Sequence, residues 1–132
     1  RTLLPGRGIT LPDPVRLWLA DAARSFRLHL LSNNPSWTRI GAVADQLGVS
    51  FTAAASKPRR GALRRVMADL DLPSGKIAMV GDRLFTDVLC GNRLGLYTVL
   101  VHPLREDGRP CGHDRVQRLE RTVARLMGAP TA

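Results

Sequence analysis

Short, continuous runs of apolar residues alternate with amphipathic stretches along this chain. The apolar runs occupy residues 28–31, 51–54, 77–80 and 97–101. Between them, apolar side chains recur every three or four residues, which is the spacing of one face of an α-helix. Strands that are apolar throughout are typical of parallel sheets that helices cover on both faces. The pattern therefore predicts a three-layer α/β fold with a parallel sheet.

Residues that flank these stretches predict where the helices begin and end. Asp13 is expected to cap the first helix, with Pro14 at its first position. Ser36 is expected to cap the second helix, and Gly48 to end it. A further helix is expected over residues 84–94.

The chain is expected to form one domain over residues 1–132, because it contains no internal repeat or linker. A mobile loop is expected at 105–113 and a frayed tail at 128–132. Between them, Asp114 is expected to start an amphipathic terminal helix with an apolar stripe of Val116, Leu119, Val123 and Leu126.

The composition limits the classes of partner. The net charge is +9, with 20 Lys and Arg against 11 Asp and Glu. Such charge indicates either an anionic partner, whether nucleic acid, a phosphorylated substrate or an acidic membrane surface, or arginines spread over solvated helix faces. Aromatic residues make up only 5%, and no nucleic-acid-binding motif occurs. The apolar runs are far shorter than the roughly 20 residues of a membrane-spanning helix. The two cysteines form no CxxC pair, which suits a reducing compartment, so we expect a cytoplasmic protein with peripheral membrane contact.

Polar side chains that suit phosphate chemistry follow three of the apolar runs. Ser32 and Asn33 follow the first run, Lys57 follows the second, and Asp82 and Asp87 follow the third. The carboxyl ends of parallel strands meet at one edge of a sheet, so these groups are expected to lie together. A hydroxyl and backbone N–H groups can bind phosphoryl oxygens, a lysine can neutralise their charge, and two carboxylates can hold Mg²⁺. The alternatives are a turn role for the serine and surface roles for the charged residues.

Three segments of the chain carry a resemblance to a known family. They are Leu-Ser-Asn-Asn at 31–34, Lys-Pro at 57–58, and Val-Gly-Asp-Arg-Leu-Phe-Thr-Asp-Val at 80–88 with Gly-Asn-Arg-Leu-Gly at 91–95. With them the chain resembles the haloacid dehalogenase (HAD) superfamily, and within it the capless subfamily IIIA phosphatases of the YqeG type. The resemblance implies a Rossmannoid fold and a Mg²⁺-dependent phosphatase.

The resemblance also implies that part of the site lies outside the chain. The family's first motif is Asp-x-Asp-x-Thr at the end of a central strand, and Thr2 matches its catalytic threonine. Both aspartates would then precede residue 1, so we expect this chain to lack the central first strand and to be inactive alone. Asp69 and Asp71 have the Asp-x-Asp spacing, but they follow a helical stripe and are not expected to act as nucleophiles.

By the same resemblance, each remaining motif residue has a role. Ser32, beside the backbone of Asn33, would hold a phosphoryl oxygen, and Lys57 would offset charge on the nucleophile and the phosphoryl group. Asp82 would ligate Mg²⁺, and Asp87 would support the metal or orient Lys57.

The spacing of the motifs leaves no room for a cap domain. Thr2 and Ser32 are 30 positions apart, and Ser32 and Lys57 are 25 apart, which one helix and its connections fill. An open site suits a bulky or surface-presented phosphate, and similar proteins act on the lipid phosphatidylglycerophosphate. The alternative hypothesis is an inactive HAD-like domain that binds an anionic partner, either RNA or a protein complex. The sequence upstream of Arg1 would decide between them; the oligomeric state stays open.

Overall fold

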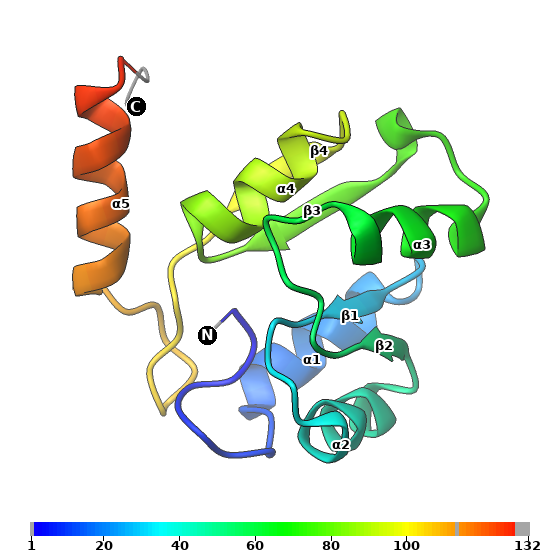
Figure 1. Cartoon of the computed structure of the whole chain (residues 1–132). Coiled ribbons are helices and arrows are strands. Elements are labelled where there is room, and N and C mark those ends of the chain that lie inside the picture. The colour runs from blue at the N-terminus through cyan, green and yellow to red at the C-terminus, as the bar shows by residue number, and fades with distance from the viewer. Residues whose placement is uncertain (1, 113, 129–132) are drawn as a thin grey trace.

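The computed structural model describes residues 2–112 and 114–128, in which helices and strands alternate as the sequence predicts (Figure 1). The elements in chain order are α1 (Asp13–Ala22), β1 (His29–Leu31), α2 (Trp37–Leu47), β2 (Ser50–Thr52), α3 (Gly61–Leu70), a 3₁₀ turn η1 (Ser74–Lys76), β3 (Ala78–Gly81), a π-helical turn η2 (Leu84–Val88), α4 (Leu89–Asn92), β4 (Tyr97–Leu100) and α5 (Arg115–Leu126). The α/β class is confirmed.

The strands form two parallel pairs. β1 pairs with β2, with Leu30 opposite Phe51, and β3 pairs with β4, with Val80 opposite Val99. Within the described residues, no strand hydrogen-bonds to both pairs. The predicted parallel pairing is therefore present, but it is split into two units whose separation matters for the site.

Each strand pair has its own hydrophobic cluster. In the first, residues of α1 and α2 pack with the segment before α1 and with residues of β1, around the buried Leu11, Val15, Leu19 and Val43. In the second, α3 and α4 pack against β3 around the buried Leu63, Met79, Cys90 and Leu96. Burial of these side chains stabilises each helix against its strand pair.

One face of the β3–β4 pair differs from the expectation of helices on both sides. Met79 is buried on the face toward the helices, whereas Val80 and Tyr97 on the other face are exposed. The element that follows β4, α5, stands to the side of this sheet (Figure 1). Its attachment through polar side chains, described below, keeps its apolar stripe from being buried.

The helix boundaries follow local hydrogen bonding. The Ser36 hydroxyl accepts from Arg39 N, and Gly48 ends α2 in the left-handed conformation with φ 62°, as predicted. The prediction for Asp13 is wrong, because the cap of α1 is Pro12, whose carbonyl accepts the first helical hydrogen bonds. Asp13 lies in the first turn instead, where it pairs with Arg16 at 3.0 Å.

The predicted helix over residues 84–94 is present without a break over 84–92, but its first part, η2, is π-helical and only α4 is α-helical. In η2, the N–H groups of Asp87 and Val88 both donate to the carbonyl of Arg83, at 2.9 and 3.2 Å. A wide turn of this kind is common at functional sites.

The terminal helix α5 forms as predicted, but its apolar stripe is not buried. The Asp114 carboxylate caps it by accepting from Val116 N and Gln117 N. Leu119 is 64% exposed and Leu126 is 84% exposed. The buried residues of this helix are instead Gln117 and Glu120.

The loop before α5 contains a closed turn. Leu104 and Pro110 form a β-bridge, and Arg105 N donates to Arg109 O. Mobility over 105–113 stays a prediction; residue 113 and the expected tail beyond residue 128 lie outside the described residues. A search of the described part of the chain found no helix with the length and apolar character needed to span a bilayer.

Gly91 offers a test of the second cluster. A Cβ at this position would lie 2.6 Å from Thr98 Cγ2 and 3.0 Å from Met79 Cβ. We expect Gly91→Ala to lower the free energy of unfolding by about 1–3 kcal/mol, because overpacking displaces β3 or β4. Gly75→Ala is the matched control, since a Cβ there meets nothing within 4 Å, and should change it by less than about 0.5 kcal/mol. Equal urea denaturation curves for both variants would contradict this packing.

Candidate active site

A groove of about 640 Å³ lies between the two strand pairs, lined by residues of β1 and β3. The residues predicted for the site from separate parts of the sequence all line it: Thr2, Ser32, Asn33, Lys57, Asp82 and Asp87. All but Thr2 follow the carboxyl ends of β1, β2 and β3, where ligands bind in open α/β sheets, and Thr2 joins them from the segment before α1. The predicted clustering is therefore present, although the catalytic, phosphate-binding and metal roles stay predictions.

A buried ion pair joins the two halves of this groove. The Lys57 ammonium donates to Asp87 Oδ1 at 2.6 Å and to the carbonyl of Leu31 at 2.9 Å. Its side chain is 10% exposed and that of Asp87 is 5% exposed. Leu31 ends β1, whereas Asp87 belongs to η2 beyond β3, so the ammonium links both strand pairs. The surface role considered for these charges is wrong, because both are buried.

Asn33 holds Lys57 through its side chain. Its Oδ1 accepts from Lys57 N at 2.7 Å, and its Nδ2 donates to Lys57 O at 2.9 Å. Both main-chain groups of the lysine are thus bound by one amide. The sequence indicated only a backbone contribution from Asn33; this positioning of Lys57 was missed.

Ser32 has the turn role that the sequence left open, and it also faces the groove. Its Oγ accepts from Asn34 N at 3.1 Å. Its main chain is held by Thr52 O and by Ala55 N, both at 2.9 Å. The hydroxyl retains a proton that it can donate to a phosphoryl oxygen in the groove.

Thr2 and Asp82 form the other half of the site. The Thr2 hydroxyl donates to Asp82 Oδ1 at 2.6 Å, and Asp82 N donates to Thr2 Oγ1 at 3.1 Å. Burial by itself raises the pKa of Asp82, whereas the hydrogen bond from the Thr2 hydroxyl and a backbone hydrogen bond lower it. The pKa of Asp82 therefore lies below its usual value, and the carboxylate is ionised at neutral pH.

Gly81 makes room for the ion pair. A Cβ on Gly81 would collide with the Asp87 carboxylate, so only glycine fits here. Asp87 Oδ2 in turn accepts from Arg83 N at 3.1 Å, which ties the start of η2 to its own side chain. The wide turn η2 and the missing side chain at Gly81 together allow the Asp87 carboxylate to lie against the end of β3.

The site can hold part of a metal coordination shell. The described residues include no cluster of three or more His, Cys, Asp or Glu suited to a metal ion. Mg²⁺, however, is usually bound by one or two carboxylates, with waters and substrate phosphate completing its shell. The ionised Asp82 fits that requirement. Asp87 fits it less well, because its two oxygens already accept from Lys57 and Arg83.

Two residues of α5 reach the site and were missed by sequence reasoning. Gln117 Nε2 donates to the carbonyls of Asp82 and Val101, at 3.1 and 2.9 Å. Glu120 accepts from Leu84 N at 3.1 Å and from Arg83 Nε at 3.2 Å. The only signal was their spacing of three, which puts both on one face of the helix.

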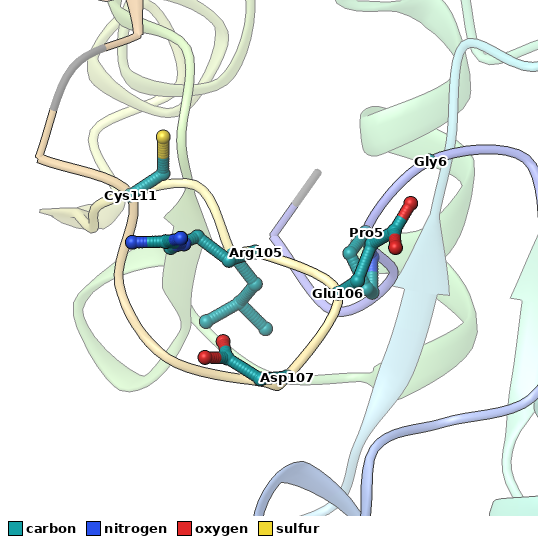
Figure 2. A pocket seen from close by; sticks show the side chains of 7 residues that line it. Pro5, Gly6, Arg105, Glu106, Asp107 and Cys111 are labelled. Carbon is teal, nitrogen blue, oxygen red and sulfur yellow. The ribbon is translucent and has the colours of Figure 1, made fainter.

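A second, smaller pocket of about 450 Å³ shares the lining residue Gly6 with the groove. Figure 2 shows Arg105, Glu106 and Asp107 on the turn before α5, with Pro5 and Gly6 close by. Its lining carries one arginine and two carboxylates, so its net charge is negative and does not favour an anion. It contains none of the predicted site residues.

Comparisons with known proteins agree with this arrangement. The HAD-hydrolase-like family model matches residues 54–106. The probable phosphatase YqeG of Bacillus subtilis is 36% identical over 78 residues, which are 59% of this chain and 45% of that protein. The chloroplastic phosphatidylglycerophosphate phosphatase 1 of Chlamydomonas reinhardtii is 34% identical over 87 residues, which are 66% of this chain and 32% of that protein.

Solved structures share the fold. An uncharacterised protein from Listeria monocytogenes serotype 4b has a TM-score of 0.61 at 16% identity. The match covers 90% of this chain and 82% of the Listeria protein. A haloacid dehalogenase-like family hydrolase from Xanthomonas campestris has a TM-score of 0.58 at 17% identity. The match covers 89% of this chain and 54% of that hydrolase.

The chain thus shares its fold with these structures, and its residues 54–106 match the HAD-hydrolase-like family. Over 78 residues its sequence is similar to that of the YqeG protein. The chain spans less than half the length of the curated relatives it matches.

The buried pair predicts a large effect on stability. We expect Asp87→Asn to lower the free energy of unfolding by about 3 kcal/mol, because it leaves the Lys57 ammonium buried without a counter-charge. Asp13→Asn, which breaks an exposed pair, should cost less than about 1 kcal/mol. Adding Lys57→Met to Asp87→Asn should lose less than the sum of the two single losses. Additive losses in urea titrations would show that the two charges do not interact.

The Thr2 hydrogen bond predicts a pH-dependent contribution. It favours the ionised form of Asp82, whose pKa in the folded state is lowered from 3.8. Its stabilisation is therefore fully present above that value and is lost as the pH falls through the lower pKa of the folded state. We expect Thr2→Val to reduce the free energy of unfolding by about 1–2 kcal/mol at neutral pH, with the difference shrinking in acid. Thr2→Ser keeps the hydroxyl and should resemble the parent; a pH-independent difference would refute the link.

Proposed function

We propose that this chain belongs to a phosphatase that hydrolyses a phosphomonoester through an aspartyl-phosphate. The observation that carries the proposal is the convergence of Lys57, Ser32 and Asp82 on one groove at the strand ends. A fixed cation, a hydroxyl donor and an ionised carboxylate suit the charge and oxygens of a phosphoryl group. The names of the Bacillus and Chlamydomonas relatives support the same reaction class.

We further propose that the nucleophile comes from a segment preceding residue 1. The groove separates β1 from β3, and a parallel strand there would join the two pairs into one sheet. Thr2 is hydrogen-bonded to Asp82, so residues directly before it would lie near the same carboxylate. An Asp-x-Asp pair at that position would face Ser32 and Lys57 across the groove.

The proposed reaction has two steps. A carboxylate oxygen of the first aspartate attacks phosphorus, the ester P–O bond breaks, and the second aspartate protonates the leaving alkoxide. Water, deprotonated by the second aspartate, then attacks phosphorus and releases inorganic phosphate from the first aspartate. Lys57 offsets negative charge on the nucleophile and phosphoryl group, while Ser32 donates to a phosphoryl oxygen. Asp87 acts on the reaction by positioning Lys57.

Asp82 would hold Mg²⁺ in this site, together with carboxylate from the proposed upstream segment. When bound, Mg²⁺ would neutralise phosphoryl charge. Asp82 is suited to this because Thr2 keeps its carboxylate ionised and oriented at the groove.

The proposed substrate carries its phosphate at a surface or on a bulky group. Among the described residues, the interval between Thr2 and Ser32 holds α1 and β1, and that between Ser32 and Lys57 holds α2 and β2, which supports a groove without a cap domain. A lipid phosphomonoester such as phosphatidylglycerophosphate, for which the Chlamydomonas relative is named, fits this opening. We propose a cytoplasmic protein that meets such a substrate at an anionic membrane.

Mutations of the site test the catalytic roles. In the intact protein with its upstream segment, we expect Lys57→Ala and Asp82→Asn each to lower kcat for an aryl phosphate by about 100-fold or more, because each removes a charge that the transition state needs. Lys76→Ala and Asp69→Asn are matched controls, since both residues are exposed, and should retain parental rates. Chelation of Mg²⁺ should abolish turnover, and readdition should restore it.

Either of two outcomes would contradict the proposal. Parental rates in Lys57→Ala and Asp82→Asn would remove those residues from the reaction. An upstream segment without aspartates, together with no turnover, would favour an inactive domain that binds an anionic partner through its net charge of +9.

A further inference from the structure

The apolar stripe of α5 lies on the surface. Its members are large and exposed, with Leu119 at 64%, Leu126 at 84% and the following Met127 at 77%. Val116 and Val123 continue the stripe at 42% and 36%. An amphipathic helix in a globular domain usually turns such a stripe toward the core. In this structure the stripe can instead pack against an apolar surface outside the domain.

The helix is held to the domain by a different face. Gln117 and Glu120 are its buried residues, and they bind the main chain at the ends of β3 and β4 and at the start of η2. At 100° per residue, these two positions lie beside the stripe and not within it. The polar attachment therefore fixes the helix while leaving the stripe uncovered by the described residues.

The opposite side of the same helix is basic. Arg118, Arg121 and Arg125 lie across the helix from the stripe, and Arg115 lies beside Leu126; all four are exposed. Glu120 is the one acidic residue within the helix, and it is occupied by Arg83 and Leu84 N. A helix with an apolar stripe on one side and arginines on the other is typical of helices that lie in a membrane interface.

We propose that α5 docks the protein on an anionic lipid bilayer, with its stripe at the acyl boundary and its arginines among the headgroup phosphates. Charge favours a bilayer over a second copy of the chain. With a net charge of +9, two copies of the chain repel each other, whereas acidic lipid attracts the chain.

This docking would place the groove at the membrane. Gln117 bonds directly to the carbonyl of Asp82, so the inserted helix and the site residue move as one unit. A phosphate on a lipid headgroup would then reach the groove without leaving the bilayer. This assignment of substrate access rests on the proposed function, whereas the docking itself does not.

Vesicle flotation tests the docking directly. The intact protein is mixed with vesicles of phosphatidylglycerol and phosphatidylcholine, or of phosphatidylcholine alone. We expect binding to the acidic vesicles only, and we expect Leu119→Gln/Leu126→Gln to lower it by at least tenfold. Leu17→Gln/Phe26→Gln is the matched control, because it removes two equally exposed apolar side chains from outside α5 and should change binding by less than twofold.

A charge variant keeps the proposal testable if the apolar variant fails to fold. Arg121→Gln/Arg125→Gln should also lower binding to acidic vesicles by about tenfold, and added salt should weaken the parent in the same way. Unchanged binding of both α5 variants would overturn the proposal. Equal loss in the control pair, or a dimer in sedimentation that Leu119→Gln/Leu126→Gln dissociates, would also overturn it.

Hydrolysis of a soluble aryl phosphate by the same samples separates the two proposals. Vesicle binding without hydrolysis would leave the docking standing and the phosphatase proposal refuted. Parental hydrolysis by the α5 variants with lost vesicle binding would support both.

Discussion

The contact of the Lys57 ammonium with Asp87 and with the Leu31 carbonyl holds the two halves of this domain in register. In the part of the chain that the structure describes, the strand pairs share no backbone hydrogen bonds, so side chains connect them across the groove. A charge buried between a carboxylate and a carbonyl does so with strong, directional bonds. Burial also constrains this contact, because removing either charge would leave the other buried without a counter-charge and would destabilise the fold.

Several features of the chain serve that contact. Asn33 binds both main-chain groups of Lys57 and so fixes where its side chain starts. Gly81 leaves space for the Asp87 carboxylate, and η2 widens so that this carboxylate folds back beneath β3. At the end of β3, Thr2 fixes the Asp82 carboxylate in a similar way through a side-chain hydrogen bond. The groove is therefore lined by groups whose positions are set before any ligand binds, which favours charge stabilisation.

The terminal helix extends this organisation to the surface. Gln117 and Glu120 cap main-chain groups at the strand ends, where backbone polar groups would otherwise lack partners. That polar attachment leaves the apolar stripe outward, so a single helix both completes the site's surroundings and presents a surface to a partner.

The sequence by itself determined the α/β order, the parallel pairing and the residues of the groove, because apolar periodicity and the residues after each strand are local patterns. It also located the ends of α2, where Ser36 and Gly48 act through neighbouring main-chain groups. It misassigned the cap of α1, since Pro12 and Asp13 are adjacent and only the helical hydrogen bonds distinguish them. Only the tertiary structure decided that Asn33 holds Lys57, that Asp87 binds it, and that α5 docks through Gln117 and Glu120. Those contacts join residues 24 to 36 positions apart in the chain, and side-chain hydrogen bonds across such distances depend on how the elements pack.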